Sequence, residues 1–183
     1  MNILNFVNNI VTRFNVKQNC VRVAVILYAE RAKVLIPLSR HNNINLLRQD
    51  INSLNVIGGG SNLTTALQVL RTEAFASNVI RSRARLVALI VTDRLTCSSQ
   101  ITQEAANLRN NMRVDVVGVA ITQTGAVDTS CLRRLVTPNQ YVESATYNQL
   151  NNYVEQVERY LHVSSSPGPG PSPGPSPGPA PSK

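Results

Sequence analysis

The sequence is poor in aromatic and acidic residues. It has no tryptophan, aromatic residues make up only 4% of it, and its 10 acidic residues are outnumbered by 18 lysines and arginines. A net charge of +8 favours acidic partners such as sulfated glycans, nucleic acid or anionic lipid. The basic residues are scattered, however, and the densest group, Arg81, Arg83 and Arg85, precedes an apolar run. We interpret this group as a solvated loop.

Long apolar runs and export signals are also lacking. No window holds about eighteen consecutive apolar residues, so we expect no membrane span. Met1 is not followed by a basic region and a short apolar core, so we expect no export signal in this chain.

Cysteine is scarce. Cys20, Cys97 and Cys131 form an odd set without CxxC or Cys/His spacing, which argues against a zinc site. The count allows one disulfide plus a free thiol but does not show which two residues pair. Taken alone, Cys97 is expected to be an ordinary, partly buried thiol.

Apolar residues make up 43% of the sequence, enough for one compact domain, which we place at residues 1–163. Their spacing predicts an alternation of helices and strands. The expected helices cover residues 2–15, 44–54, 62–75, 98–112, 132–137 and 146–161, and the expected strands cover 21–28, 33–38, 86–92, 114–121 and 141–143. The succession predicts a doubly wound α/β fold with a mostly parallel sheet, helices on both faces and one antiparallel edge strand.

Details of this pattern carry further predictions. The run 86–92 is the most apolar strand and is expected at the sheet centre. Ser98 is expected to cap a helix, and Thr146 with Gln149 has the spacing of a capping box. Residues 164–183 have proline at every second position from Pro167 to Pro181, which predicts an extended, solvated tail or linker.

Two polar stretches are candidates for a functional site. Gly58-Gly59-Gly60-Ser61-Asn62 separates two expected helices, and Asp93 ends the strand Leu86–Thr92. Ligands of doubly wound sheets bind beyond the carboxyl ends of the strands, and Ser61 and Asp93 offer the oxygen ligands that magnesium prefers. A nucleotide cradle is disfavoured, because no lysine precedes Thr64 and the loop follows a helix.

With the amino-terminal helix and the hairpin 21–38, these stretches resemble a von Willebrand factor type A domain of the extracellular-matrix kind, over about residues 1 to 163. The resemblance implies a Rossmann-like fold and an extracellular, secreted module that mediates adhesion and is not an enzyme. It implies a metal-ion-dependent adhesion site with Ser61 and Asp93 as magnesium ligands and with Gly60, Asn62 and Arg94 on the partner-binding face. The implied partner is a matrix protein, such as a collagenous or fibrous one, and not nucleic acid.

The sequence departs from the family pattern in ways that make this site degenerate. Ser61 stands where the family usually has threonine, and Arg94 replaces a glycine beside the aspartate. The family's first strand, with its Asp-x-Ser-x-Ser motif, is absent ahead of the first helix. That strand would lie between the strands 21–28 and 86–92, so we expect two apolar strand edges to be left unpaired and interpret the chain as truncated.

Other readings stay open. A structural matrix component with a silent metal site could attach to polyanions through its basic surface, and an intracellular domain that serves complex assembly is a third reading. Asn62-Leu63-Thr64 is an N-glycosylation sequon inside the metal loop. Tyr28, His41 and His162 have no acid or nucleophile in a catalytic arrangement and are expected to be structural or surface residues.

Overall fold

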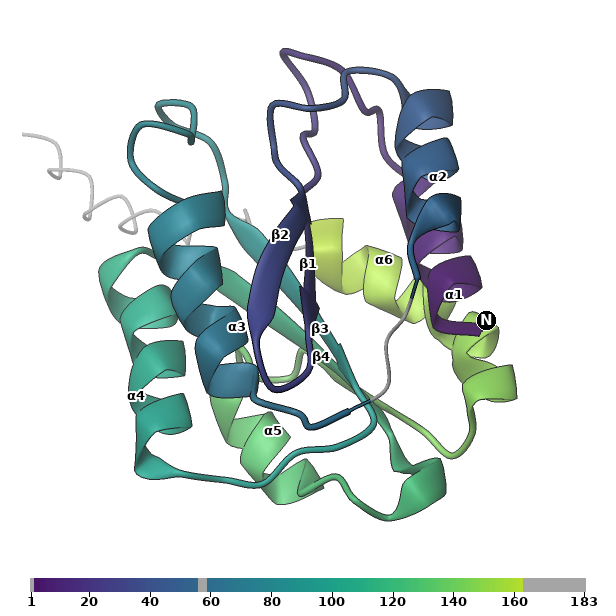
Figure 1. The fold of residues 1–183 in the computed structure, drawn as a ribbon, viewed down its shortest axis with the longest axis vertical. Helices are drawn as coiled ribbons and strands as arrows, with labels where there is room; N and C mark the ends of the chain where they lie inside the picture. The colour runs from purple at the N-terminus through teal and green to yellow at the C-terminus, as the bar shows by residue number, and fades with distance from the viewer. Residues whose placement is uncertain (1, 56–58, 163–183) are drawn as a thin grey trace, which may run out of the picture.

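The computed structural model describes residues 2–55 and 59–162. Figure 1 shows helices wrapped around strands in the order that the sequence predicts. The α-helices are α1 (Asn2–Val11), α2 (Ile44–Ser53), α3 (Leu63–Val69), α4 (Ser99–Ala106), α5 (Thr129–Leu135) and α6 (Val154–His162). The strands are β1 (Val25–Tyr28), β2 (Ala32–Ile36), β3 (Val87–Thr92), β4 (Asp115–Ile121) and β5 (Tyr141–Ser144). Short π-helical turns η1 (Leu70–Ala74) and η2 (Asn107–Asn111) extend α3 and α4, and 3-10 turns form η3 (Thr122–Thr124) and η4 (Tyr147–Tyr153).

The strands form two sheets. In one sheet β3, β4 and β5 run parallel in that order, and in the other β1 and β2 form an antiparallel hairpin. The register of the parallel pair is regular from Val87 opposite Asp115 to Thr92 opposite Ala120. The parallel sheet, the flanking helices and the antiparallel outer strand confirm the predicted doubly wound α/β class.

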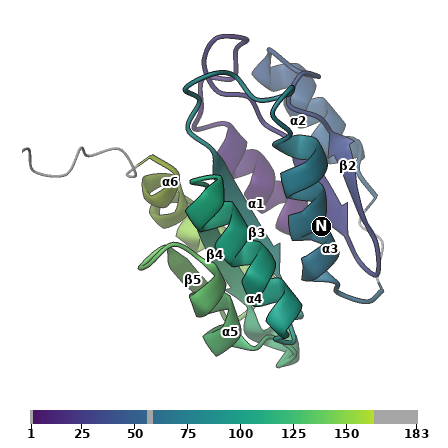
Figure 2. The same ribbon diagram turned by 90° about the vertical axis from the view of Figure 1, so that its left-hand side faces the viewer.

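Helices cover both faces of the parallel sheet (Figure 2). On one face Leu67 of α3, Ile101 of α4 and Leu132 of α5 pack in a core shared with β3 and β4. On the other face α1 and α6 pack against β4 and β5, with Phe6 fully buried. A third cluster joins α2 and α1 to the hairpin.

Strand β4 lies at the centre of the described parallel sheet. Val116 and Ala120 face the core under α3, α4 and α5, whereas Val117, Val119 and Ile121 face the core under α1 and α6. All five side chains are 0% exposed. Between them Gly118 allows α5 to approach, because a Cβ atom there would lie 2.6 Å from Val136 Cγ1. A strand buried on both faces explains its unbroken apolar run.

The prediction that the strand ending at Asp93 lies at the sheet centre is wrong for the described residues. β3 is an edge of its sheet, and Val87, Leu89 and Val91 are only half-buried. All four residues of β1 are half-buried as well. Two apolar strands thus have unpaired edges, as the absence of a first strand led us to expect.

Several element boundaries differ from the predicted ones. α1 ends at Val11 rather than Asn15, and of the expected strand 21–28 only Val25–Tyr28 forms, because the earlier residues have no neighbouring strand apart from an isolated bridge between Val16 and Val21. The prediction of a capping box at Thr146 and Gln149 is wrong. A 3-10 turn starts there, and the Thr146 side chain makes no capping hydrogen bond.

The predicted helix cap at Ser98 is confirmed, since its Oγ accepts a hydrogen bond from the Ile101 amide at 3.2 Å. Within residues 2–55 and 59–162 no helix is both long and apolar enough to cross a membrane. The tail that we expect at residues 164–183 lies outside the described residues.

Candidate functional site

The glycine loop is fixed against the turn of the β1–β2 hairpin. Gly59 has φ +150°, a backbone conformation that side chains disfavour. A Cβ atom on Gly60 would lie 2.8 Å from Glu30 Cγ, so any other residue would displace the Glu30 side chain. The Asn62 amide then donates to the Ala29 carbonyl at 2.6 Å. These contacts place Ser61 beyond the carboxyl end of β1; Gly58 lies outside the described residues.

Three hydroxyl groups hold the loop that follows β3. Ser61 Oγ donates to the Arg94 carbonyl at 2.6 Å, and Thr92 Oγ1 donates to the same oxygen at 2.8 Å. Thr124 Oγ1 donates to the Asp93 carbonyl at 3.0 Å. The two stretches singled out in the sequence, 33 positions apart at Ser61 and Arg94, are therefore in direct contact at the carboxyl end of the sheet.

The Asp93 carboxylate has a partner of its own. The hydroxyl of Tyr147, at the start of η4, donates a short hydrogen bond to Asp93 Oδ2. Burial, and after it this hydrogen bond, raises the pKa of Tyr147 to about 12. Tyr147 is therefore protonated at neutral pH and remains a donor to the carboxylate.

The donor set around Ser61 and Asp93 does not fit a complete magnesium site. Magnesium takes about six oxygens in near-octahedral geometry, and here the sequence-predicted ligands supply one carboxylate and one hydroxyl. The carboxylate accepts from Tyr147, and the hydroxyl donates to a backbone carbonyl. Arg94, the next residue along the chain, is exposed and makes no ion pair within the described ranges.

A hollow of about 440 Å³ lies beside the site. Its lining mixes polar and apolar residues from the glycine loop, the hairpin turn, the segment before α4 and the start of α4, including Glu30, Ser61, Asn62, Thr96 and Gln100. Asn62 is exposed, and its Oδ1 caps α3 by accepting from the Thr65 amide at 3.2 Å. The sequon asparagine thus lies on the rim of this hollow.

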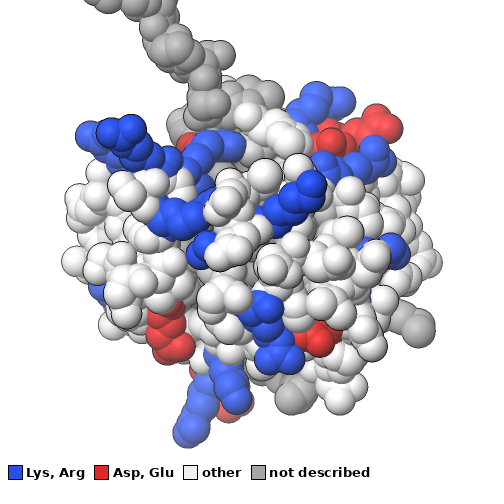
Figure 3. All heavy atoms as spheres, turned by 90° about the horizontal axis from the view of Figure 1, so that it is seen from above, with Lys and Arg blue, Asp and Glu red and all other residues white. Residues whose placement is uncertain are grey.

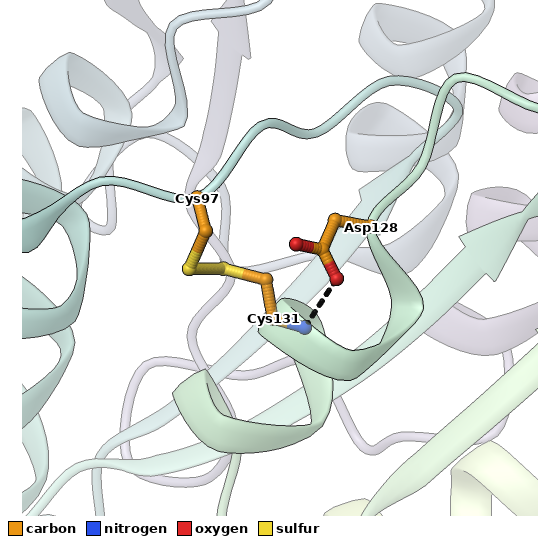
Figure 4. Close-up of side chains that lie close together, drawn as sticks. All are labelled: Cys97, Asp128 and Cys131. Atoms are coloured by element: carbon orange, nitrogen blue, oxygen red, sulfur yellow. Dashed lines mark hydrogen bonds between the residues drawn. A yellow bond between two sulfur atoms is a disulfide. The ribbon is translucent and has the colours of Figure 1, made fainter.

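A second cluster of potential metal ligands, Cys97, Asp128 and Cys131, is structural (Figure 4). Cys97 and Cys131 form a disulfide, and Asp128 Oδ1 accepts from the Cys131 amide at 2.8 Å as the cap of α5. A disulfide leaves no thiolate to bind a metal. The expectation of an ordinary thiol at Cys97 is therefore wrong, and Cys20 is the free, exposed cysteine.

Sequence reasoning missed several residues of the site. Tyr147 and Thr124 lie 54 and 31 positions from Asp93. No motif links a lone tyrosine or threonine to a carboxylate at such separations. The segment with Arg81, Arg83 and Arg85 is a loop in which Arg83 and Arg85 are exposed, as predicted. Two of its arginines also make contacts that the sequence did not reveal: Arg81 Nη1 donates to the Gln18 carbonyl at 3.1 Å, and Arg85 Nε pairs with Asp115 Oδ2 at 2.9 Å.

Comparison with protein families gives a match over most of the chain. The model of the von Willebrand factor type A domain matches residues 1–156. Among individual proteins, the human collagen alpha-5(VI) chain is 28% identical over 153 residues, which is 82% of this chain but 6% of that protein. The chain therefore spans a small part of the length of this relative.

Solved structures show the same fold. Proximal thread matrix protein 1 from the mussel byssus superposes with a TM-score of 0.80 at 18% identity, covering 87% of this chain and 41% of that one. A second structure of that protein, with a zinc-occupied MIDAS motif, gives a TM-score of 0.79 at 18% identity over 87% of this chain and 42% of that one. At these identities the likeness shows the fold alone.

Proposed function

The chain belongs to the von Willebrand factor type A family, and we propose that it serves as an extracellular-matrix module that binds another matrix protein. The face beyond the carboxyl ends of β1 and β3, around Gly60, Ser61, Asn62, Asp93 and Arg94, is the proposed contact surface. The similarity to a collagen alpha-5(VI) chain supports a matrix setting and a collagenous or fibrous partner. We propose no catalytic role.

The observation that carries the proposal is the hydrogen bond from Ser61 Oγ to the Arg94 carbonyl, which joins the two loops beside the 440 Å³ hollow. Loops that are already held in place lose less conformational entropy when a partner binds. The Asp93 carboxylate, which a cation would otherwise bind, accepts a hydrogen bond from the Tyr147 hydroxyl. Arg94 adds a positive charge to this face. These features support a face that recognises an acidic or hydrogen-bonding partner group without requiring a metal.

The test is binding of the full chain to immobilised fibrillar collagen, with and without EDTA or added magnesium. We expect Arg94→Glu to weaken binding about tenfold or more, since it reverses a charge at the contact. Arg48→Glu is the matched control, because Arg48 is an exposed arginine on α2. Binding that survives EDTA but not Arg94→Glu supports the metal-free face.

Two other outcomes would change the proposal. Loss of binding in EDTA, restored by magnesium and abolished in Asp93→Ala, would show that a metal is required after all. Binding that ignores EDTA, Arg94→Glu and Asp93→Ala alike would rule out this face as the contact surface.

A second candidate function rests on the opposite end of the strands. Figure 3 views this end of the molecule, where lysines and arginines are spread across the face and outnumber the acidic side chains. Two contacting loops contribute there: Arg22 and Arg81 both donate to the Gln18 carbonyl, at 3.1 Å each, and exposed Lys17 and Arg83 flank them. This arrangement favours attachment to a polyanion such as a sulfated glycan.

Ionic strength separates the two candidates. Attachment to immobilised heparin through exposed charges should fall steeply between about 0.05 and 0.2 M salt, because the Debye length is about 10 Å at 0.1 M. Arg83→Glu should weaken it, and Arg94→Glu, at the other end of the strands, should affect it less. Heparin binding that is insensitive to salt would exclude this second function.

A further inference from the structure

Asparagine is abundant in this chain, but a single asparagine has the sequence pattern of an N-glycan acceptor. Asn62-Leu63-Thr64 is the only Asn-x-Ser/Thr tripeptide among the 183 residues, and its middle residue is not proline. The tripeptide begins at the loop that contains Ser61 and continues into α3. The pattern therefore lies at the edge of the contact face proposed above.

The Asn62 side chain can carry a sugar without losing a contact. Asn62 is exposed, and its Oδ1 accepts a hydrogen bond from the Thr65 amide at 3.2 Å. Its Nδ2, the atom to which an N-glycan is attached, donates no hydrogen bond to any residue that the structure describes. A glycosylated asparagine keeps its carbonyl oxygen, so the cap of α3 survives the modification.

The Thr64 side chain is free as well. Its hydroxyl makes no hydrogen bond within residues 2–55 and 59–162, whereas the hydroxyl of the neighbouring Thr65 donates to the Asn62 carbonyl at 2.8 Å. The hydroxyl of Thr64 is therefore not needed to hold the loop or to start the helix. In an acceptor sequence, by contrast, the hydroxyl two positions after the asparagine is required for transfer of the glycan.

Space for the first sugar lies beside the acceptor. Asn62 and Thr64 both line the hollow of about 440 Å³. Three exposed side chains from other segments line it too, and none of them makes a hydrogen bond within the described ranges: Glu30, Thr96 and Gln100. A sugar has several hydroxyl groups, so these side chains can replace part of the water that it loses on contact with the protein. The glycan therefore fits here without moving the loop.

We propose that Asn62 is the attachment site of an N-linked glycan and that this glycan covers the contact face around Ser61 and Arg94. In the transfer step Nδ2 bonds to C1 of the first sugar and loses one proton, while the bond from C1 to the pyrophosphate oxygen of a lipid-linked oligosaccharide breaks. The covering of the face rests on the proposed function. Ser61 precedes Asn62 and donates to the Arg94 carbonyl at 2.6 Å, so a bulky, hydrated glycan at Asn62 competes with a protein partner for the same surface.

The first test asks whether the glycan is attached. The full chain is produced in mammalian cells behind a cleavable export signal, and its mass is measured before and after treatment with peptide N-glycosidase F. We expect an excess of mass that the enzyme removes. The enzyme hydrolyses the side-chain amide to a carboxyl group, so treatment in heavy-oxygen water should label residue 62 alone. Loss of the export signal, read from the same spectrum, shows that the chain entered the secretory pathway.

Three variants locate the acceptor sequence. Thr64→Ala removes the required hydroxyl and leaves Asn62 in place, so the glycan should be lost while the fold is kept. Thr64→Ser retains a hydroxyl and should retain the glycan. Thr65→Ala removes a neighbouring hydroxyl outside the acceptor pattern, and it should retain the glycan as well. Circular dichroism shows whether each variant is folded.

The second test measures how the glycan affects the face. Secreted Thr64→Ser should bind immobilised fibrillar collagen about tenfold or more weakly than secreted Thr64→Ala, because only the first carries the glycan. Made in bacteria without the glycan, the same two variants should bind equally.

A measurement without a partner compares how fast two exposed arginines react with phenylglyoxal. The glycan should slow the reaction at Arg94 and leave it unchanged at Arg48 on α2.

Three results would overturn the proposal. A secreted chain that has lost its export signal but carries no glycan would show that Asn62 is not an acceptor. A glycan retained in Thr64→Ala would place the modification elsewhere. Equal reactivity of Arg94 with and without the glycan would show that the face is not covered. Failure of the bacterial chains to bind collagen would instead contradict the proposed function, and the mass and reactivity measurements would still decide this proposal.

Discussion

Strands β3 and β4 are both largely apolar and pair with each other, yet they are buried to different extents. From Val116 to Ile121 every residue of β4 is buried, whereas buried and half-buried residues alternate along β3. In the part of the chain that the structure describes, β4 has a strand on each side, β5 and β3, whereas β3 has one only on the side of β4. The comparison shows that the burial of an apolar strand depends on its neighbours as much as on its own residues.

The same difference explains why extra contacts gather at the end of β3. The Ser61, Thr92 and Thr124 hydroxyls hold the loop after it, Tyr147 holds the Asp93 side chain, and the Cys97–Cys131 disulfide ties the following segment to α5. α5 in turn packs on β4. Side-chain and covalent contacts thus supplement a strand that has a ladder on one side only.

The largest expected effect comes from removing the disulfide that ties the β3 side to α5. The bridged cysteines have a sequence separation of 34, and loss of the bridge in the double variant Cys97→Ala, Cys131→Ala should lower the free energy of unfolding by about 3–4 kcal/mol. Urea denaturation measures it, with Cys20→Ala as the control, because Cys20 is free and exposed. A loss below about 1 kcal/mol would mean that the tether contributes little to the fold.

The next effect tests how closely β4 is packed. Gly118→Ala brings a Cβ atom to 2.6 Å from Val136 Cγ1 and 3.3 Å from Leu132 Cγ, so α5 has to move away from β4. We expect a loss of about 2 kcal/mol in the free energy of unfolding. A neutral substitution, measured by the same denaturation, would show that the α5–β4 contact is looser than the distances imply.

A smaller effect compares the two strands directly. Val91 of β3 and Val119 of β4 are partners in the register, but Val119 is fully buried and Val91 is half-buried. Val119→Ala should lower the free energy of unfolding by about 2 kcal/mol and Val91→Ala by about 1 kcal/mol, because folding removes less apolar area from water at Val91. Equal losses would contradict this comparison, because they would mean that Val91 is as well packed in solution as Val119.

The smallest effect concerns Tyr147 and pH. Its pKa is raised to about 12, so the folded chain keeps a proton that the unfolded chain releases near pH 10. The stability that this group contributes is complete below pH 10 and is lost as the pH rises toward 12. At neutral pH Tyr147→Phe should cost about 1 kcal/mol, and the variant should lose less stability than the unmodified chain between pH 10 and 12.

Tyr153→Phe is the control for this experiment. Tyr141, whose pKa is raised to about 12 by burial and then by Glu143, contributes to the alkaline loss in both proteins. Only the difference in alkaline loss of stability between the Tyr147 variant and the control therefore reports on the hydrogen bond from Tyr147 to Asp93. An identical pH dependence of the two variants would contradict the role of this hydrogen bond.

Much of the fold could be predicted from the sequence, because its signals are local. The apolar run from Val114 to Ile121 and the stripe of α1 show the period of their elements, and Ser98 precedes its helix as a cap. The ends of the strands could not be predicted as well, because they depend on which other strands lie alongside. Val21 has strand-forming neighbours in sequence but no adjacent strand in space, apart from the bridge to Val16.

The candidate site could be predicted only in part. Glycines followed by Ser61, and an aspartate after an apolar strand, indicate two loops at one end of a sheet. That Ser61 binds the Arg94 carbonyl, or that Tyr147 binds Asp93, depends on how segments far apart in sequence pack together. The same limit applies to the disulfide, since three cysteines without motif spacing do not reveal which two meet.

The disulfide also limits how far the chain can be stretched. When the chain is pulled from its ends, the residues between Cys97 and Cys131 are bypassed by the covalent bridge and cannot be drawn out. For a separation of 34 residues, roughly 110–120 Å of extended chain is withheld from stretching. That withheld segment contains β4, so pulling alone cannot extend the fully buried strand while the bridge remains oxidised.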